Sequence, residues 1–145
     1  MKRGFLDSSV LFTAVNSPIG GSAKIFTLKK IKLVTSKLVL TEVERNIRQK
    51  LASYHFKRFF ILVEKIEILN QEPDLALIQK ARKVIVEKDA AILAEAKMAR
   101  CDCLITLDRK HFFTPKATRF LRPKRILTPK MLFDTLDSKD STDDN

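Results

Sequence analysis

Glycine, proline, cysteine and histidine are all scarce in this chain of 145 residues, which contains 3 Gly, 5 Pro, 2 Cys and 2 His. Together with 45% hydrophobic and 31% charged residues, this composition excludes a fibrous repeat and a largely disordered chain. The length suits one hydrophobic core. We therefore expect a single domain over residues 1–136 and a disordered acidic tail over residues 137–145.

The few cysteines and histidines do not form a zinc motif. Cys101 and Cys103 are two residues apart, so a disulfide between them would be strained, and no second Cys or His pair accompanies them. His55 and His111 are separated by the middle of the chain. We expect two free, buried thiols.

Long apolar runs are also absent. The longest run of aliphatic and aromatic residues extends from Phe59 to Val63, far short of the ~20 residues that cross a bilayer. Asp7 interrupts the apolar segment near the amino terminus, so no export signal is apparent. These absences predict a cytoplasmic protein that does not span a membrane.

Positive charge is abundant. The net charge is +11, and residues 137–145 contribute −3 through four Asp and one Lys, so the remainder carries +14. Such a surplus favours polyanionic partners, nucleic acid or anionic lipid, although charge alone does not choose between them and many basic proteins bind neither.

The hydrophobic pattern alternates between short apolar runs and segments of helical periodicity. We predict strands near residues 3–6, 31–35, 67–69, 103–107 and 126–127, and helices over residues 36–51, 55–65, 75–86 and 90–100. We also predict a helix turn or two over residues 23–29 and further helices that begin at Val10 and after Thr128. Strands joined by helices of this length predict an α/β fold with three layers, in which helices cover both faces of a central parallel sheet.

Acidic residues follow two of the predicted strands. In an open parallel sheet, ligands bind beyond the carboxyl ends of the strands. Asp7 ends the first strand and Asp108 follows the strand at residues 103–107, while Asp89 opens the helix that leads into that strand. We expect the three carboxylates to converge. The simpler interpretation is that each acid is only a helix cap or a turn residue.

A fourth acid comes from the helix after Ser36, where Glu42 and Glu44 are ~200° apart and cannot share a face. Glu44 has Arg48 four residues later, the spacing of an exposed ion pair. Glu42 has apolar neighbours and no evident cationic partner, so we assign it to the site.

These elements together resemble the PIN domain, whose members include VapC-like toxins. The resemblance rests on Phe5-Leu-Asp7-Ser-Ser-Val-Leu, on Ser36 with Glu42, on Asp89-Ala-Ala-Ile-Leu-Ala-Glu-Ala and on Leu104-Ile-Thr106-Leu-Asp108, and it spans residues 3–136. It implies a Mg²⁺- or Mn²⁺-dependent nuclease, most often an endoribonuclease that leaves a 5′-phosphate and a 3′-hydroxyl. Asp7, Glu42, Asp89 and Asp108 would be its metal-binding and catalytic acids, with Thr106 as a supporting hydroxyl.

The chain departs from that family pattern at Ser9, where many members have Asn. A hydroxyl can still hydrogen-bond a water of the metal site, so we expect altered rather than absent activity. The chemistry itself suits the residues, because hard dications prefer oxygen ligands and converging carboxylates repel one another unless a cation intervenes.

Basic residues follow Asp108 closely and are expected near the same sheet edge, where they could hold RNA phosphates. We assign RNA binding to Arg109, Lys110, Lys116, Arg119 and Arg122, with Lys124 and Arg125 next to them. The interleaved Phe112, Phe113 and Phe120 could stack on bases, but they fit the core at least as well.

Resemblance also implies partners: an antitoxin protein that covers the acidic pocket, and a second copy in a homodimer. The main alternative function is a catalytically silent PIN-like RNA-binding or scaffold protein. A response-regulator receiver also gathers acids at a sheet edge, but this chain lacks the adjacent acidic pair in its first strand-to-helix turn. DNA instead of RNA as the substrate stays open.

Overall fold

The structure is a computed structural model that describes the backbone of residues 1–143 and the side chains of residues 1–138. Its elements, in chain order, are β1 (Arg3–Leu6), α1 (Ser8–Asn16), α2 (Gly21–Lys24), the 3₁₀ turn η1 (Ile25–Thr27), β2 (Lys32–Ser36), α3 (Lys37–Lys50), α4 (His55–Val63), β3 (Glu67–Leu69), α5 (Leu75–Arg82), α6 (Glu87–Met98), β4 (Cys103–Ile105), α7 (Arg109–Phe112), α8 (Pro115–Leu121), β5 (Arg125–Leu127) and α9 (Pro129–Asp143).

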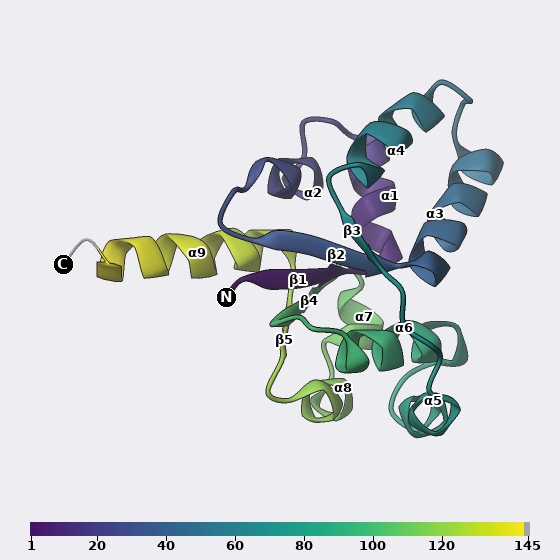
Figure 1. The fold of residues 1–145 in the computed structure, drawn as a ribbon, viewed down its shortest axis with the longest axis vertical. Coiled ribbons are helices and arrows are strands. Elements are labelled where there is room, and N and C mark those ends of the chain that lie inside the picture. Colours follow the sequence, from purple (N-terminus) through teal and green to yellow (C-terminus); the bar gives the residue numbers. More distant parts are fainter. Residues whose placement is uncertain (144–145) are drawn as a thin grey trace.

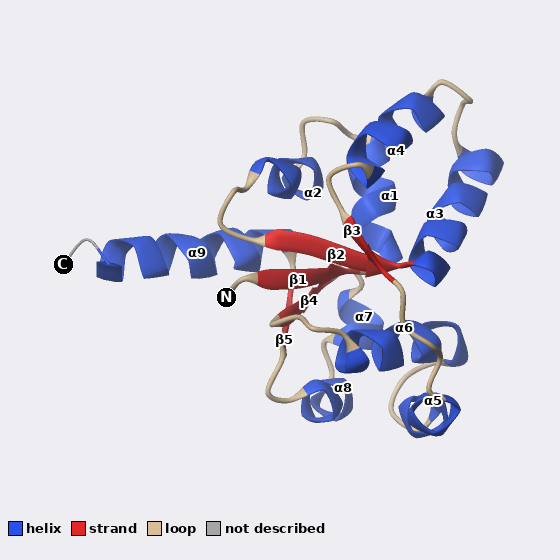
Figure 2. Cartoon of the chain, in the orientation of Figure 1, coloured by secondary structure: helices blue, strands red, loops and turns tan. Residues whose placement is uncertain are grey.

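The strands form a five-stranded sheet of order β3-β2-β1-β4-β5, in which every neighbouring pair is parallel. Helices α1 to α4 lie on one side of the sheet and α5 to α8 on the other (Figures 1 and 2). The predicted three-layer α/β fold is therefore confirmed. Both faces of the central strands are covered, which explains why β1 and β4 are almost continuously apolar and buried.

The two central strands also fix the position of the site. In their register, Phe5 is paired with Leu104 and Leu6 with Ile105, so β1 and β4 end side by side. Gly4 permits close packing there, because a Cβ at this position would lie 2.8 Å from Cδ1 of Ile105. The residues that follow β1 and β4 are consequently held at one edge of the sheet.

Helix α3 begins as the sequence predicts. The Ser36 hydroxyl accepts a hydrogen bond from the Val39 amide at 3.2 Å, which satisfies one of the free amides of the first turn. Val39, Val43 and Ile47 then face the core at helical intervals. This packing leaves the opposite face of α3 exposed. Glu42 lies between the buried and the exposed face and lines a pocket together with Asp7, at the end of β1.

Two helices were not predicted, α7 and α8. The first is a single turn after Asp108, and the second begins with Thr114, whose hydroxyl accepts from the Ala117 amide at 3.1 Å, followed by Pro115. At the other end, α9 continues through the predicted tail as far as Asp143. The domain boundary at residue 136 stays a prediction, and residues 144–145 lie outside the described residues.

The two cysteines are free, as expected, with Cys103 buried and Cys101 half-buried. Among the described residues, no helix combines the length and the apolar character that a membrane span requires.

Candidate active site

A small pocket lies at the carboxyl ends of β1 and β4, with a volume of about 180 Å³. All four predicted acids line it, together with residues from α1, α3 and α6. The lining residues are Asp7, Ser8, Ser9, Phe12, Glu42, Asn46, Lys88, Asp89 and Asp108. Four distant segments of the sequence thus meet where the topology of a parallel sheet places a ligand site.

Asp7 stands in the turn between β1 and α1 and is 3% exposed. Its backbone amide donates to the Ile105 carbonyl at 3.0 Å, which ties the end of β1 to β4. Asp7 occupies the N-cap position of α1, yet its side chain makes no capping hydrogen bond. Its carboxylate is therefore directed into the pocket instead of serving the helix.

Two hydroxyls hold the Asp7 carboxylate. Ser9 Oγ and Thr106 Oγ1 both donate to Asp7 Oδ2, at 2.7 and 2.8 Å. Each hydroxyl also accepts a hydrogen bond from a backbone amide. The Ser9 hydroxyl accepts from the Leu107 amide at 3.0 Å, and the Thr106 hydroxyl accepts from the Asp108 amide at 3.0 Å. Ser9 therefore links both strand ends to Asp7, a role that its hydroxyl can fill although it departs from the family's common Asn.

Asp108 begins α7 and uses its two carboxylate oxygens differently. Oδ1 accepts the His111 amide at 3.1 Å and caps the helix, while Oδ2 accepts from Nδ1 of the His111 ring at 2.7 Å. The simple helix-cap interpretation accounts for Oδ1 only. The second oxygen belongs to a group that includes His111 and the nearby Asp89.

Asp89 lies in the first turn of α6 and is 7% exposed, but it is not the N-cap, which is Val86. Burial, followed by the charge of Asp7, raises the pKa of Asp89 to about 6, despite the opposing influence of Lys88. Its Oδ2 atom has no hydrogen-bond partner among the described residues. A buried carboxylate oxygen without a partner is costly and indicates that a cation or a proton belongs there.

Glu42 completes the acidic lining from α3. Burial, and next the charge of Asp7, raises the pKa of Glu42, while a hydrogen bond from Ser8 lowers it. Glu44 instead pairs with Arg48 at 2.7 Å on the exposed face of the same helix. The separation of the two glutamates that the helical spacing predicted is confirmed, and only Glu42 reaches the pocket.

The donor set fits a divalent cation. Ligand atoms of Asp89, Asp108 and His111 all lie within 4.8 Å of one another, and Asp7 and Glu42 line the same pocket. Hard dications take carboxylate oxygens, and a dication would give the unpartnered Asp89 Oδ2 an electrostatic partner. The residues of the site therefore fit a metal ion.

Three residues near the pocket escaped the sequence analysis. His111 contacts Asp108 and lies 3.7 Å from Asp89 through Nδ1. Lys88 lines the pocket and lowers the pKa of Asp89, and Arg45 of α3 borders it and lowers the pKa of Glu42. His111 and Lys88 are three and one residues from assigned acids, a proximity that could have identified them.

The predicted RNA-binding residues do not form one group. Lys110 and Lys116 line a groove beside the acidic pocket, together with His111, Arg82 and Lys83. Arg109 faces a different hollow, next to Lys130. Arg119 and Arg122 are exposed on α8 and just after it.

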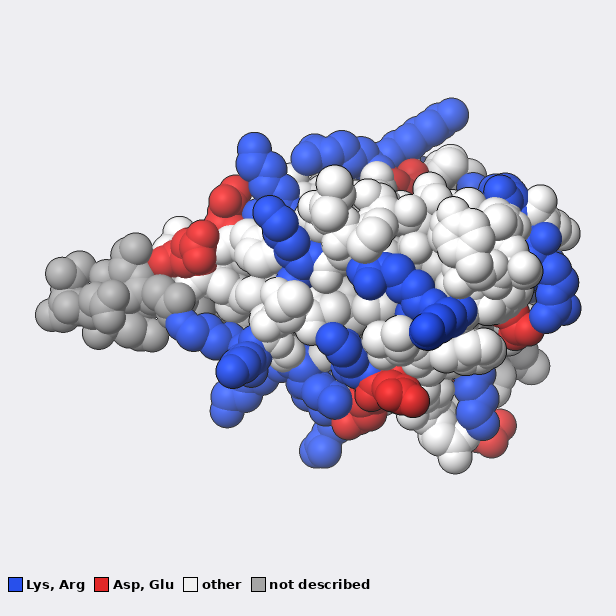
Figure 3. All heavy atoms as spheres, turned by 90° about the horizontal axis from the view of Figure 1, so that it is seen from above, with Lys and Arg blue, Asp and Glu red and all other residues white. Residues whose placement is uncertain are grey.

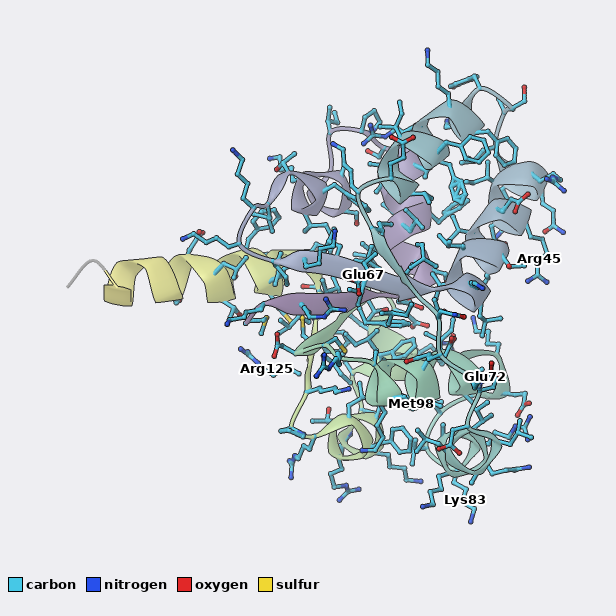
Figure 4. The ribbon with its side chains drawn as sticks, in the orientation of Figure 1. Arg45, Glu67, Glu72, Lys83, Met98 and Arg125 are labelled. Atoms are coloured by element: carbon cyan, nitrogen blue, oxygen red, sulfur yellow. The ribbon has the colours of Figure 1, made fainter. Side chains whose placement is uncertain are left out.

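The expectation for Lys124 and Arg125 is wrong. The Lys124 ammonium donates hydrogen bonds to the carbonyls of Ala96, Lys97 and Ala99, so it caps the carboxyl end of α6. Arg125 begins β5, at the strand end opposite the acids, and lies across the molecule from Arg45 in Figure 4. Phe112 is fully buried, which assigns it to the core.

Basic side chains are nevertheless widespread. On the side of the molecule that carries α2 and α4, Lys and Arg occupy much of the rim and acidic groups are few (Figure 3). This face of the molecule is therefore mainly basic, in keeping with the net charge of +11.

The family model of the PIN domain matches residues 4–116. The matched segment contains β1 except Arg3, all of β2 to β4, and all four acids of the pocket. This chain belongs to the PIN-domain family.

Solved structures share the fold at low sequence identity. VapBC2 from Rickettsia felis, bound to a DNA fragment from their promoter, has a TM-score of 0.68 at 16% identity, covering 87% of this chain and 98% of that one. PAE2754 from Pyrobaculum aerophilum has a TM-score of 0.65 at 14% identity, covering 94% and 90%. VapBC-1 from nontypeable Haemophilus influenzae has a TM-score of 0.62 at 16% identity, covering 88% of this chain and 98% of that one. No curated protein sequence matches this chain.

Proposed function

We propose that this protein is a divalent-metal-dependent endoribonuclease, in which Asp7, Glu42, Asp89 and Asp108 hold the metal. Membership of the PIN family supports nuclease chemistry. The observation that carries the proposal is the convergence of four acids on one pocket in which Asp89 Oδ2 is buried without a partner. Mg²⁺ or Mn²⁺ suits this oxygen-rich site.

The chain's own residues would divide the work of phosphodiester hydrolysis. The four acids would hold the dication, which when bound would polarise the attacking water and offset negative charge on the phosphate. Ser9 and Thr106 fix the orientation of Asp7 through Oδ2, and Asp108 is fixed by α7. Lys88 and Arg45, at the border of the pocket, are placed to attract the phosphates that flank the scissile bond.

We place the path of the RNA along the positively charged groove beside the pocket. Lys110 and Lys116 line the groove next to His111, so an RNA strand that enters the pocket can continue along this groove. Phosphate contacts of this kind position the strand without reading its sequence. Arg109, Arg119 and Arg122 would contribute to the same attraction from neighbouring surfaces.

We further propose that the protein is the toxin of a toxin–antitoxin pair, that an antitoxin covers the acidic pocket, that the chain forms a homodimer and that it acts in the cytoplasm. Two of the similar structures are VapBC structures, which supports an antitoxin partner. Co-purification with the product of a neighbouring gene, and the mass of the isolated protein in solution, test these two partners.

The matched pair Glu42→Gln and Glu44→Gln tests the nuclease proposal. Both changes remove one charge from α3, but only Glu42 lines the pocket. With single-stranded RNA and Mn²⁺, we expect E42Q to lose at least about tenfold in cleavage rate and E44Q to remain within about twofold of the wild type.

EDTA should stop cleavage by the wild-type protein. RNA binding without EDTA-sensitive cleavage would contradict the proposal and favour the catalytically silent RNA-binding protein. Equal losses in E42Q and E44Q would also contradict it, because they would attribute the effect to the charge of α3 instead of to the site.

A further inference from the structure

We propose that His111 is a direct nitrogen ligand of the cation, through Nδ1, and completes a mixed site with Asp89 and Asp108 that prefers a first-row transition-metal dication to Mg²⁺. This inference rests on the proposed function only in taking the carboxylate pocket as the cation site. It names the class of metal that the pocket selects.

Geometry is the first support. Nδ1 of His111 lies 2.7 Å from Asp108 Oδ2 and 3.7 Å from Asp89 Oδ2. Two ligand atoms that share a dication at ~2.1 Å lie about 3 to 4 Å apart. The 3.7 Å separation falls in this range, and the 2.7 Å hydrogen bond would have to lengthen slightly when an ion replaces its proton. Ligand atoms of Asp89, Asp108 and His111 all lie within 4.8 Å of one another, so small side-chain rotations would bring them to one ion.

The local fold explains why the ring stays in this position. Asp108 is the N-cap of the one-turn helix α7 and His111 lies within that turn. The Asp108 carboxylate accepts hydrogen bonds from both the amide and the ring nitrogen of His111. The side chain of His111 is largely buried at 23% exposure. A ring held by its own helix turn loses little conformational freedom when it binds a metal.

The second support is the unpartnered oxygen. Asp89 Oδ2 lies 3.7 Å from Nδ1 of His111, and it has no hydrogen-bond donor among the described residues. In the metal-free protein, the Nδ1 proton of His111 is hydrogen-bonded to Asp108 and not to Asp89. One dication in place of that proton would satisfy both carboxylates and the ring, with the imidazole proton then on Nε2.

Selectivity follows from the nitrogen. Carboxylates and waters suit Mg²⁺, whereas an imidazole ligand favours later divalent metals in the Irving–Williams order. A site built from Asp7, Asp89 and Asp108 alone would have oxygen ligands only. The presence of His111 should therefore strengthen binding of Co²⁺ much more than binding of Mg²⁺.

The competing explanation is that His111 only orients Asp108 by a hydrogen bond and never touches the metal. The two explanations differ in whether the imidazole ring of His111 is bonded to the metal. Co²⁺ is paramagnetic, so a ring bound to it has NMR signals shifted far outside their normal range. The chain contains two histidines, and the other, His55, begins α4 on the opposite side of the sheet from α7 (Figure 1).

The experiment titrates the ¹⁵N-labelled, full-length protein with Co²⁺ and observes the histidine rings. We expect the His111 ring signals to shift strongly at one equivalent and those of His55 to stay within the normal range. In calorimetry, His111→Gln should lower Co²⁺ affinity at least about tenfold and Mg²⁺ affinity less than about threefold. The matched control His55→Gln should change neither.

Unshifted His111 signals with Co²⁺ bound, equal Co²⁺ affinity in H111Q and wild type, or no Co²⁺ binding at all would each overturn the inference. If H111Q does not fold, as judged by circular dichroism, the wild-type spectra decide alone. A shifted His111 without RNA cleavage would reject the proposed function only. EDTA-sensitive cleavage with an unshifted His111 would reject the present inference only.

Discussion

The two edges of the sheet carry acids in opposite electrostatic settings. At the amino edge, Glu67 pairs with Arg3, and Asp102 accepts the amides of Lys2 and Arg3 at 2.7 and 2.9 Å. At the carboxyl edge, Asp7, Glu42, Asp89 and Asp108 face one another. The ion pair lowers the pKa of Glu67, whereas burial and neighbouring charge raise the pKa of Asp89.

Size does not distinguish a functional pocket here. The hollow at the amino edge has a volume of about 710 Å³, against about 180 Å³ for the acidic pocket. The acids of the larger hollow have partners within the fold, so they require no ligand. The smaller pocket gathers four carboxylates, and Oδ2 of one of them, Asp89, is buried without a hydrogen-bond partner. This difference marks the smaller pocket as the candidate functional site.

The largest expected effect is on catalysis. Asp7→Asn and Asp108→Asn should each lower the rate of metal-dependent RNA cleavage by at least about 100-fold, because each removes a charged ligand from the metal site. The amino-edge variants Glu67→Gln and Asp102→Asn should retain rates within about threefold of the wild type. Comparable losses at both edges would remove the distinction between them.

The next effect is stabilisation by metal. At 100 times its dissociation constant, Mn²⁺ should stabilise the wild-type protein by about 2.7 kcal/mol and raise its Tm by several degrees. Asp89→Asn should lose most of this increase, since it removes the charge of the carboxylate whose Oδ2 lacks a hydrogen-bond donor. Glu67→Gln should retain it, and thermal unfolding with and without Mn²⁺ measures the contrast.

The stability of the metal-free protein should also depend on pH with opposite sign at the two edges. For Asp89, the folded pKa of about 6 exceeds the ordinary value of 3.8, so stability is lost as pH rises from about 4 through 6. Asp89→Asn should therefore stabilise the metal-free protein by on the order of 2 kcal/mol at pH 8 and by little at pH 4.

For Glu67 the pKa is lowered, so its stabilising pair is present at neutral pH and is lost in acid. Glu67→Gln should destabilise the protein slightly at pH 8 and not at low pH. Denaturant unfolding in EDTA at both pH values checks both variants. A destabilising effect of Asp89→Asn at pH 8 would contradict the conclusion that the charged Asp89 carboxylate lowers the stability of the metal-free protein.

The smallest effect concerns the hydroxyls that hold Asp7. Thr106→Val removes one of the two donors to Asp7 Oδ2 and leaves Ser9 in place. We expect about a tenfold loss in cleavage rate, because orientation of a metal-binding carboxylate is impaired but its charge is kept. Thr114→Val, which removes the cap of α8, serves as the matched control and should affect stability more than cleavage rate.

The sequence was sufficient to predict the convergence of the acids. Asp7 and Asp108 each follow a short apolar run, and the rule that parallel strands end at one edge brings them together without knowledge of any contact. The choice of Glu42 over Glu44 followed from helical spacing and from Arg48. Even the short strand Glu67–Leu69 could be predicted between two breaks in the helical pattern.

The segment after Asp108 could not be predicted in the same way. α7 is a single turn stabilised by the Asp108 cap, too short to show a hydrophobic period, so the position of His111 was not apparent. Thr114-Pro115 carries the same start signal as Thr128-Pro129, and it could have revealed α8. The burial of Lys124 against the end of α6 depends on tertiary packing, which no local pattern reports.

Anomalous diffraction from crystals soaked in Mn²⁺ tests the central claim most directly, because it locates the ion without reference to activity. The account predicts a peak at the carboxyl edge, among Asp7, Asp89, Asp108 and His111. A peak only at the amino edge, beside Glu67 and Asp102, or the absence of any peak in the acidic pocket at saturating Mn²⁺, would contradict it.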